Sequence, residues 1–165
     1  MQTSNGVKKM IAVNLAVIFF ISLDRFLKVF AFNNQDSEFN LLGEILKFNY
    51  KNNYNVAFSL PLNGNFLIFL IALIIIILIL LGFSYAKKNQ TGKAIALFLV
   101  ILGASSNLYD RLQYGFVVDY LDLKYFTVFN LADMMIVGGV IYLLFFIKHD
   151  QYETIFTRKI INKER

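Results

Sequence analysis

The stretch "FLIFLIALIIIILILLGFSY", residues 66–85, holds no charged side chain in any of its 20 positions. At a rise of about 1.5 Å per residue, a helix of this length crosses the roughly 30 Å hydrocarbon core of a bilayer. The whole chain is apolar for its length, since hydrophobic residues make up 58% of its 165 residues and the mean hydropathy is +0.58. We therefore predict that residues 66–85 form a membrane-spanning helix of an integral membrane protein.

Three further apolar runs, each interrupted by a few polar residues, are plausible spans: residues 10–32, 94–109 and 131–147. The first run is not expected to be a cleaved signal peptide, because Asp24, Arg25 and Lys28 stand where the small residues of a cleavage site would be needed. We predict an all-α membrane fold with four transmembrane helices. We see no internal repeat or linker, so residues 1–165 are expected to form one domain.

Basic residues gather before the first predicted helix, between the second and third, and after the fourth. Ten of the 16 basic residues lie in these three segments: Lys8, Lys9, Lys87, Lys88, Lys93, Lys148, Arg158, Lys159, Lys163 and Arg165. Lys and Arg accumulate in short loops on the cytoplasmic side of a membrane. We therefore predict that both termini are cytoplasmic and that residues 33–65 and 110–130 meet on the extracytoplasmic side.

Outside the predicted spans, two segments carry a structural signal. Residues 39–60 alternate apolar and polar side chains around residues 45–50 and are followed by Pro61, which predicts a small extracytoplasmic β-sheet between the first two helices. Residues 152–165 mix Ile and Phe with Lys and Arg, so an amphipathic helix on the cytoplasmic leaflet and a frayed basic tail both remain open. The net charge of +5 is explained by topology and lipid, and no pattern indicates nucleic-acid binding.

The sequence excludes several kinds of chemistry. It contains no cysteine and a single histidine, His149. A disulfide framework, a thiol nucleophile, a cysteine-containing metal site and a histidine-based triad are therefore excluded. We expect no metal and no cofactor, and we expect His149 to flank the last helix.

Several ionisable and amide side chains lie at the ends of the predicted helices. Insertion of such a group costs about 2.5–3.5 kcal/mol, so these residues often mark function. Asp24 and Lys28 are four residues apart and are expected to form an ion pair on one helix face. Asn107 and Asp110 share a face of the third helix, with Arg111 next to them, and a network of hydrogen bonds at the helix end is the simpler account.

Two more aspartates are harder to explain structurally. Asp133 lies in the first turn of the last helix if Asn130 caps that helix, and it then gains from the helix dipole. Asp119 follows Phe116, Val117 and Val118 without a neighbouring base, which predicts partial desolvation and a raised pKa. Two carboxyl groups in one pocket cannot both ionise cheaply, so one serves as acid and the other as base in peptide hydrolysis.

These residues carry a family resemblance. "GASSNLYDRLQYGFVVDYLDL" (103–123) and "FNLAD" (129–133) resemble the "GNxxDR", "GxVVDF" and "FNxAD" motifs of lipoprotein signal peptidase, also called signal peptidase II. "LDRFLK" (23–28) resembles its "DxxxK" element, and "NYNVAFSL" (53–60) resembles its "NxGAAFS" element. The five motifs occur in the family's order and lie in the first, third and fourth predicted helices and in both outer segments.

The resemblance implies an aspartic endopeptidase of the bacterial cytoplasmic (inner) membrane whose active site is at the extracytoplasmic face. Such an enzyme removes the signal peptide from diacylglyceryl-modified prolipoproteins by cutting before the lipidated cysteine. The catalytic pair would be Asp119 and Asp133. The implied site-shaping residues are Asp24, Lys28, Asn53, Asn107, Asp110, Arg111, Asn130 and Ala132. The implied partners are lipidated precursors, membrane lipids and the cyclic peptide inhibitor globomycin, and we expect a monomer.

The chain departs from the family pattern at a few positions. Asn55 and Val56 replace glycine and alanine, Ser106 replaces glycine, and residues 120–132 are shorter than the family pattern leads us to expect. Two alternatives therefore stay open: a catalytically inactive homologue that binds lipidated peptides, and a small transporter or channel subunit that uses buried aspartates. A conduction path would place polar groups through the depth of the membrane, whereas the second predicted helix contributes none.

Overall fold

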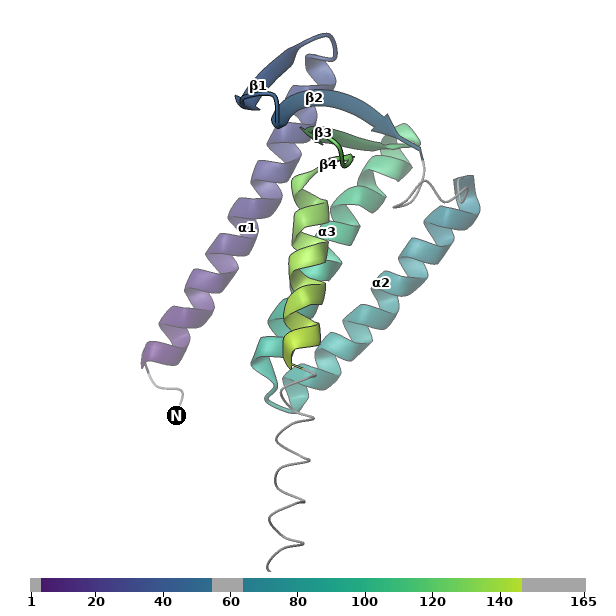
Figure 1. Cartoon of the computed structure of the whole chain (residues 1–165). Helices are drawn as coiled ribbons and strands as arrows, with labels where there is room; N and C mark the ends of the chain where they lie inside the picture. The colour runs from purple at the N-terminus through teal and green to yellow at the C-terminus, as the bar shows by residue number, and fades with distance from the viewer. Residues whose placement is uncertain (1–3, 55–63, 147–165) are drawn as a thin grey trace, which may run out of the picture.

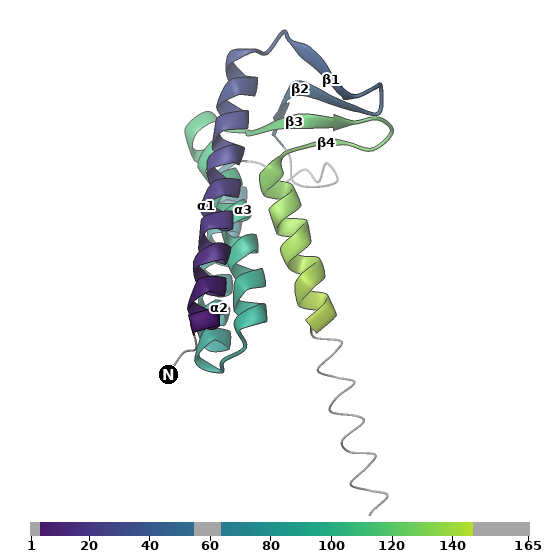
Figure 2. The same cartoon turned by 90° about the vertical axis from the view of Figure 1, so that its left-hand side faces the viewer.

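The computed structural model describes residues 4–54 and 64–146 and shows helices that carry a small β-sheet at one end (Figures 1 and 2). The helices are α1 (Ser4–Asn33), α2 (Gly64–Lys87), α3 (Thr91–Tyr114) and a C-terminal helix (Leu131–Phe146). The strands are β1 (Glu38–Leu42), β2 (Leu46–Asn53), β3 (Val117–Leu123) and β4 (Val128–Phe129). The fold is therefore mostly helical, with a small antiparallel sheet, as predicted.

Each predicted helix is present, although α1 begins at Ser4 where residue 10 was predicted, and α3 ends at Tyr114 where residue 109 was predicted. By length and composition, α2 and α3 are long and apolar enough to cross a membrane. Large apolar side chains of α2, among them Phe66, Leu80 and Phe83, are exposed, as expected of a surface that faces lipid. The described part of the C-terminal helix is shorter, and α1 carries charged residues, so four membrane spans and cytoplasmic termini stay predictions.

The sheet is larger than predicted. Its strand order is β1-β2-β3-β4 with every neighbouring pair antiparallel, so residues 117–129 add two strands to the segment after α1. No strand was predicted for residues 110–130, yet Asp119 lies in β3 opposite Lys51 of β2. The first four residues of β3 are all buried, so this strand lacks the alternation by which an exposed strand is recognised.

Parts of three predictions fall outside the described residues. These are the end of the predicted sheet segment at residues 55–60 with Pro61, the position of His149, and the tail at residues 152–165.

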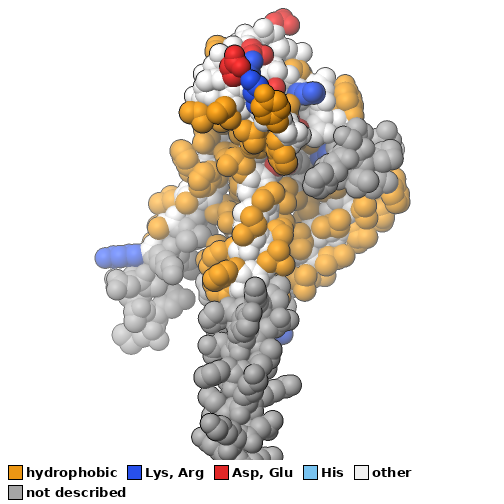
Figure 3. Space-filling model, in the orientation of Figure 1, with side chains coloured by type: hydrophobic (Ala, Val, Ile, Leu, Met, Phe, Trp, Pro, Cys, Tyr) orange, Lys and Arg blue, Asp and Glu red, His pale blue; other side chains and the backbone are white. Residues whose placement is uncertain are grey.

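An apolar cluster joins the sheet to the helices. Ala31 of α1, Phe48 of β2, and Val118 and Tyr120 of β3 are buried together. In the view of Figure 3, hydrophobic side chains cover the helical part of the molecule and acidic side chains gather at the sheet end. The sheet is thus held on the ends of the helices by apolar packing, and the charged side chains that this view shows on the sheet lie at the end away from the helices.

The C-terminal helix approaches α3 very closely. A Cβ atom added at Gly103 would lie 2.5 Å from the carbonyl oxygen of Ala132, and one added at Gly139 would lie 2.7 Å from that of Ala96. Only glycine tolerates such contacts without a shift of the backbone. This packing brings the sheet end of α3 against the first turn of the C-terminal helix.

Candidate active site

Asp119 and Asp133 come from different elements and meet at one residue, Asn130. The side-chain nitrogen of Asn130 donates to Asp119 Oδ1 over 2.7 Å. The backbone N–H of Asn130 donates to Asp133 Oδ2 over 3.1 Å, and Asn130 Oδ1 accepts from the Asp133 N–H over 2.9 Å. This reciprocal arrangement is a helix cap, as predicted from the spacing. We call Asp119 and Asp133 the aspartate pair.

Two more asparagines hold the aspartate pair from other elements. Asn53 of β2 donates to Asp119 Oδ2 over 2.8 Å, and Asn107 of α3 donates to Asp133 Oδ1 over 2.7 Å. Lys28 donates to Asn107 Oδ1 over 2.8 Å. Because an ammonium group can only donate, this contact fixes the oxygen of Asn107 towards Lys28 and its nitrogen towards Asp133.

The environment of Asp119 favours its protonated form. Its side chain is buried, and its pKa is raised to about 7, first by burial and second by the negative charge of Asp133. Hydrogen bonds from Asn53 and Asn130 and the charge of Lys28 act in the opposite direction. Asp133 is more exposed than Asp119. The predicted rise in pKa is confirmed in direction, and near neutral pH the aspartate pair can hold a single proton.

A buried ionic cluster lies behind the aspartate pair. Lys28 Nζ lies 2.8 Å from Asp110 Oδ2 and 3.3 Å from Asp24 Oδ2, and all three side chains are at most 1% exposed. The predicted Asp24–Lys28 ion pair is confirmed, although Asp110 is the nearer partner. Asp110 also pairs with Arg25 and accepts the backbone N–H of Val118 over 3.3 Å. The negative charges of Asp24 and Asp110 balance the positive charges of Lys28 and Arg25. The cluster therefore fixes β3 without adding net charge.

Asp24 reaches the start of the C-terminal helix. Its Oδ1 accepts the backbone N–H of Ala132 over 3.1 Å and the hydroxyl of Tyr120 over 3.2 Å. Its Oδ2 accepts the hydroxyl of Ser106 over 2.6 Å. Sequence reasoning missed the polar contributions of Tyr120, Ser106 and Arg25. A phenol next to Asp119 was the available signal for Tyr120, because a buried tyrosine hydroxyl needs a hydrogen-bond partner.

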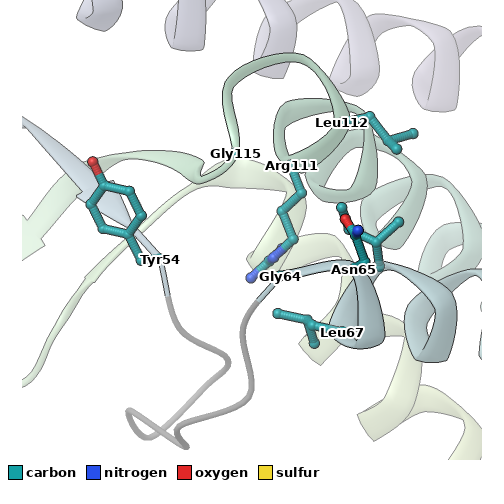
Figure 4. A pocket seen from close by; sticks show the side chains of 8 residues that line it. Tyr54, Gly64, Asn65, Leu67, Arg111, Leu112 and Gly115 are labelled. Atoms are coloured by element: carbon teal, nitrogen blue, oxygen red, sulfur yellow. The ribbon is translucent and has the colours of Figure 1, made fainter.

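A cavity of about 350 Å³ opens beside this network, between the end of β2, the start of α2 and the end of α3 (Figure 4). Its lining residues are Tyr54, Gly64, Asn65, Leu67, Ile68, Arg111, Leu112 and Gly115. The aspartate pair does not line it. Arg111 connects the two, because its side chain lies at the cavity while Arg111 Nη1 faces the carbonyl oxygen of Asn107 at 3.5 Å.

All ten predicted site residues are thus part of one region around the aspartate pair. Asn53 and Arg111 lie at the edges of this region. Within residues 4–54 and 64–146, no group of three or more His, Cys, Asp or Glu side chains is placed to share a metal ion.

The fold and the sequence both match known proteins. A solved structure titled as a bacterial membrane enzyme, determined by the in meso method at 2.3 Å resolution, superposes with a TM-score of 0.73 at 22% identity, covering 85% of this chain and 89% of that one. The lipoprotein signal peptidase of Caldicellulosiruptor bescii is 42% identical over 124 residues, which are 75% of this chain and 81% of that protein. The lipoprotein signal peptidase of Clostridium novyi is 32% identical over 140 residues, covering 81% of this chain and 95% of that protein.

A family model described as signal peptidase (SPase) II matches residues 16–148. The match includes the aspartate pair, the three asparagines that hold it and the buried ionic cluster. The chain belongs to the signal peptidase II family.

Proposed function

We propose that this protein is an aspartic endopeptidase that removes the signal peptide from diacylglyceryl-modified prolipoproteins by cutting before the lipidated cysteine. Membership of the signal peptidase II family supports the cleavage of prolipoprotein signal peptides. The observation that supports an aspartic mechanism is the joint contact of Asp119 and Asp133 with Asn130. A buried carboxyl group with a raised pKa beside a more exposed carboxylate provides an acid and a base at the same place.

The reaction begins with one proton on the aspartate pair. The ionised carboxylate takes a proton from a water molecule as the water oxygen attacks the scissile carbonyl carbon, and the protonated carboxyl group gives its proton to the carbonyl oxygen. The tetrahedral intermediate collapses when its C–N bond breaks. One carboxyl group of the aspartate pair gives its proton to the leaving amine, which is the amino group of the lipidated cysteine. The other carboxylate takes a proton from a hydroxyl group of the intermediate, so the signal peptide leaves as a carboxylic acid and the aspartate pair again holds one proton.

The asparagines support this chemistry without changing the charge of the site. Asn53, Asn107 and Asn130 each donate to a carboxylate oxygen, so they hold the aspartate pair in place while leaving room for one shared proton. Lys28 orients Asn107 and also lowers the pKa of Asp119 by its charge. Preorganised donors of this kind cost no rearrangement during the reaction.

The cavity beside Arg111 is suited to the lipidated part of the substrate. Leu67, Ile68 and Leu112 give it apolar walls, and Arg111 provides a cationic donor. We assign Arg111 to an ester carbonyl of the diacylglyceryl group or to a backbone carbonyl of the substrate, both of which accept hydrogen bonds. The acyl chains then remain in the bilayer beside the helices while the scissile bond lies at the aspartate pair.

The proposal includes orientation and assembly. The sheet end would face the extracytoplasmic side of the bacterial inner membrane, in agreement with the distribution of basic residues. A monomer would be sufficient, because one chain supplies both carboxylates and every hydrogen-bond donor described above.

The experiment compares two forms of one prolipoprotein, with and without the diacylglyceryl group, after incubation with the purified protein in lipid nanodiscs. We expect cleavage of the lipidated form alone, a product whose mass begins at the modified cysteine, and inhibition by globomycin. Equal cleavage of the unlipidated form, a cut at another bond, or no cleavage would refute the proposed function.

A further inference from the structure

The first turn of the C-terminal helix is held by side chains from β3, from α1 and from its own N-cap residue. A helix leaves its first backbone N–H groups without partners inside the helix. Here the N–H of Leu131 donates to the hydroxyl of Tyr120 over 3.0 Å, that of Ala132 to Asp24 over 3.1 Å, and that of Asp133 to Asn130 over 2.9 Å. The N–H groups of Leu131 and Ala132 therefore tie the start of this helix to β3 and to α1.

The Tyr120 hydroxyl is fixed on both sides. It accepts from the Leu131 N–H and donates to Asp24 Oδ1 over 3.2 Å. Its ring is fully buried and packs against Phe48, with 5.4 Å between the ring centroids. Burial raises the pKa of the Tyr120 phenol above its usual range, so the hydroxyl keeps its proton and continues to donate to Asp24.

This hydroxyl ties together the two backbone segments that carry the aspartate pair. Tyr120 follows Asp119 directly in β3, and Leu131 lies two residues before Asp133. Between these segments, β4 contains only two residues, and its pairing with β3 is confined to Phe129 and Val128. The sheet alone therefore gives the start of the C-terminal helix little support.

We infer that Tyr120 is a positioning residue, whose hydroxyl sets the position of Asp133 relative to Asp119 through its bond to the first N–H of the C-terminal helix. The inference rests on the proposed function, because positioning matters for a pair that acts together. A displacement of about 1 Å at a reacting group can reduce a rate by about 100-fold. Tyr120 donates to neither carboxylate of the pair, so it acts through the backbone.

The test replaces Tyr120 by Phe, which removes the hydroxyl and keeps the ring. The family motif "GxVVDF" has phenylalanine at this position, so the ring alone is compatible with the fold. Tyr50→Phe is the matched control, because Tyr50 packs at the edge of the same apolar cluster in β2. Active sites are counted by titration with globomycin, so that unfolded protein does not lower the measured kcat.

We expect Tyr120→Phe to lower kcat per titrated site by about three- to tenfold, with KM within twofold of the wild-type value, and Tyr50→Phe to match the wild type. An unchanged kcat per site in Tyr120→Phe, or an equal loss in Tyr50→Phe, would overturn the inference. Absence of cleavage by the wild type and both variants would instead count against the proposed function.

A second variant removes the same hydrogen bond from the other side. Leu131→Pro deletes the N–H donor at the first helical position, where proline is well tolerated. Leu131 also packs against the apolar cluster, so Leu131→Ala, which keeps the N–H, is the control for this variant. Relative to Leu131→Ala, we expect Leu131→Pro to lose kcat per site about as Tyr120→Phe does. Little further loss is expected when Leu131→Pro and Tyr120→Phe are combined, because both remove the same hydrogen bond. If Tyr120→Phe gives no titratable sites, the inference is tested with Leu131→Pro alone. A kcat per site equal to that of the wild type in Leu131→Pro would overturn the inference.

Discussion

At the scale of single residues, the proposed chemistry depends on the different environments of two carboxyl groups, those of Asp119 and Asp133. Asp119 is almost completely buried, whereas Asp133 lies in the first turn of a helix and is more exposed. Burial of an ionised carboxylate destabilises the folded protein. The surrounding asparagines and the charge of Lys28 reduce that cost, yet the pKa of Asp119 is still raised to about 7. Asp119 therefore lowers the stability of the folded protein at neutral pH, which agrees with the catalytic role that we propose for it.

The first prediction concerns stability as a function of pH. The pKa of Asp119 is raised from 3.8 to about 7, so the folded protein binds this proton more tightly than the unfolded chain does. The resulting stabilisation is present below pH 3.8 and is lost as the pH rises to about 7. Asp119→Asn carries no such ionisation, so its melting temperature relative to the wild type should rise from pH 4 to pH 7 and then level off.

The measurement is thermal unfolding in detergent at a series of pH values. The control is Asp122→Asn, a neighbouring and less buried carboxylate in the same strand. Its melting temperature relative to the wild type should change little over the same range. A constant difference between Asp119→Asn and the wild type would contradict the raised pKa.

The residues of the site could be predicted from sequence to different degrees. Charged and amide side chains inside apolar segments are expensive, so Asp24, Lys28, Asn107 and Asp133 stood out from their surroundings. Tyr120 did not, because tyrosine is common in apolar segments and only the fold shows that its hydroxyl is buried between Asp24 and Leu131. The nearness of Asp110 to Lys28 likewise depends on how α1 and α3 pack.

At the scale of elements, the geometry of the site depends on the contact between α3 and the C-terminal helix. Gly103 faces the carbonyl oxygen of Ala132, one residue before Asp133. One turn further along α3, Asn107 donates to Asp133. A change in the separation of these helices therefore moves Asn107 away from the carboxylate that it holds.

The second prediction follows from this contact. Gly103→Ala places a Cβ atom 2.5 Å from the Ala132 carbonyl oxygen, which forces the helices apart because backbone cannot yield as a side-chain tip does. We expect cleavage activity to fall by at least about tenfold and the melting temperature to drop by several degrees, consistent with about 1–3 kcal/mol of overpacking. Activity and thermal unfolding are measured on the same preparation.

Gly138→Ala is the control for this prediction. Gly138 lies in the C-terminal helix, and a Cβ atom there meets nothing within 4 Å. Alanine also favours helix over glycine, so this variant should keep full activity and equal or higher stability. Equal behaviour of the Gly103 and Gly138 variants would show that close packing of the two helices does not set the site.

The helices were predictable as elements, but β3 was not. Long apolar runs identify α2 and α3 by length and composition alone. β3 is buried on both faces over its first four residues, and a short buried strand of this kind has no period that distinguishes it from a loop or a helix end. Its pairing with β2 is a contact between distant segments, which no local pattern contains.

At the scale of the whole molecule, the sheet extends sideways beyond the C-terminal helix (Figure 2). Its two hairpin tips lie together, since the Lys124 N–H donates to the Ile45 carbonyl over 2.9 Å and Lys124 Nζ lies 2.7 Å from Glu44. Ile45 and Phe126, at these tips, are exposed. Figure 3 shows hydrophobic side chains on the part of the sheet end nearer the helices and charged ones farther away. This amphipathic arrangement fits a sheet that rests on the membrane surface.

The third prediction tests that placement. The chain contains no tryptophan, so a single introduced tryptophan reports on its own surroundings. Phe126→Trp should be quenched by brominated lipids in nanodiscs, because an exposed aromatic side chain at the tip is expected at the headgroup level. Asp36→Trp lies in the connection between α1 and β1, farther from the helical part than the hairpin tips (Figure 2), and should not be quenched. Equal quenching at both positions would refute the placement.

The central claim is that Asp119 and Asp133 act together as the catalytic pair, and single-turnover cleavage of a lipidated precursor tests it most directly. Asp119→Asn and Asp133→Asn should each bind globomycin yet lower the cleavage rate by at least about 1,000-fold, since each removes an acid or base group that the other cannot replace. Asp122→Asn should cleave at the wild-type rate. Cleavage at a rate near that of the wild type by either variant of the pair would contradict the claim.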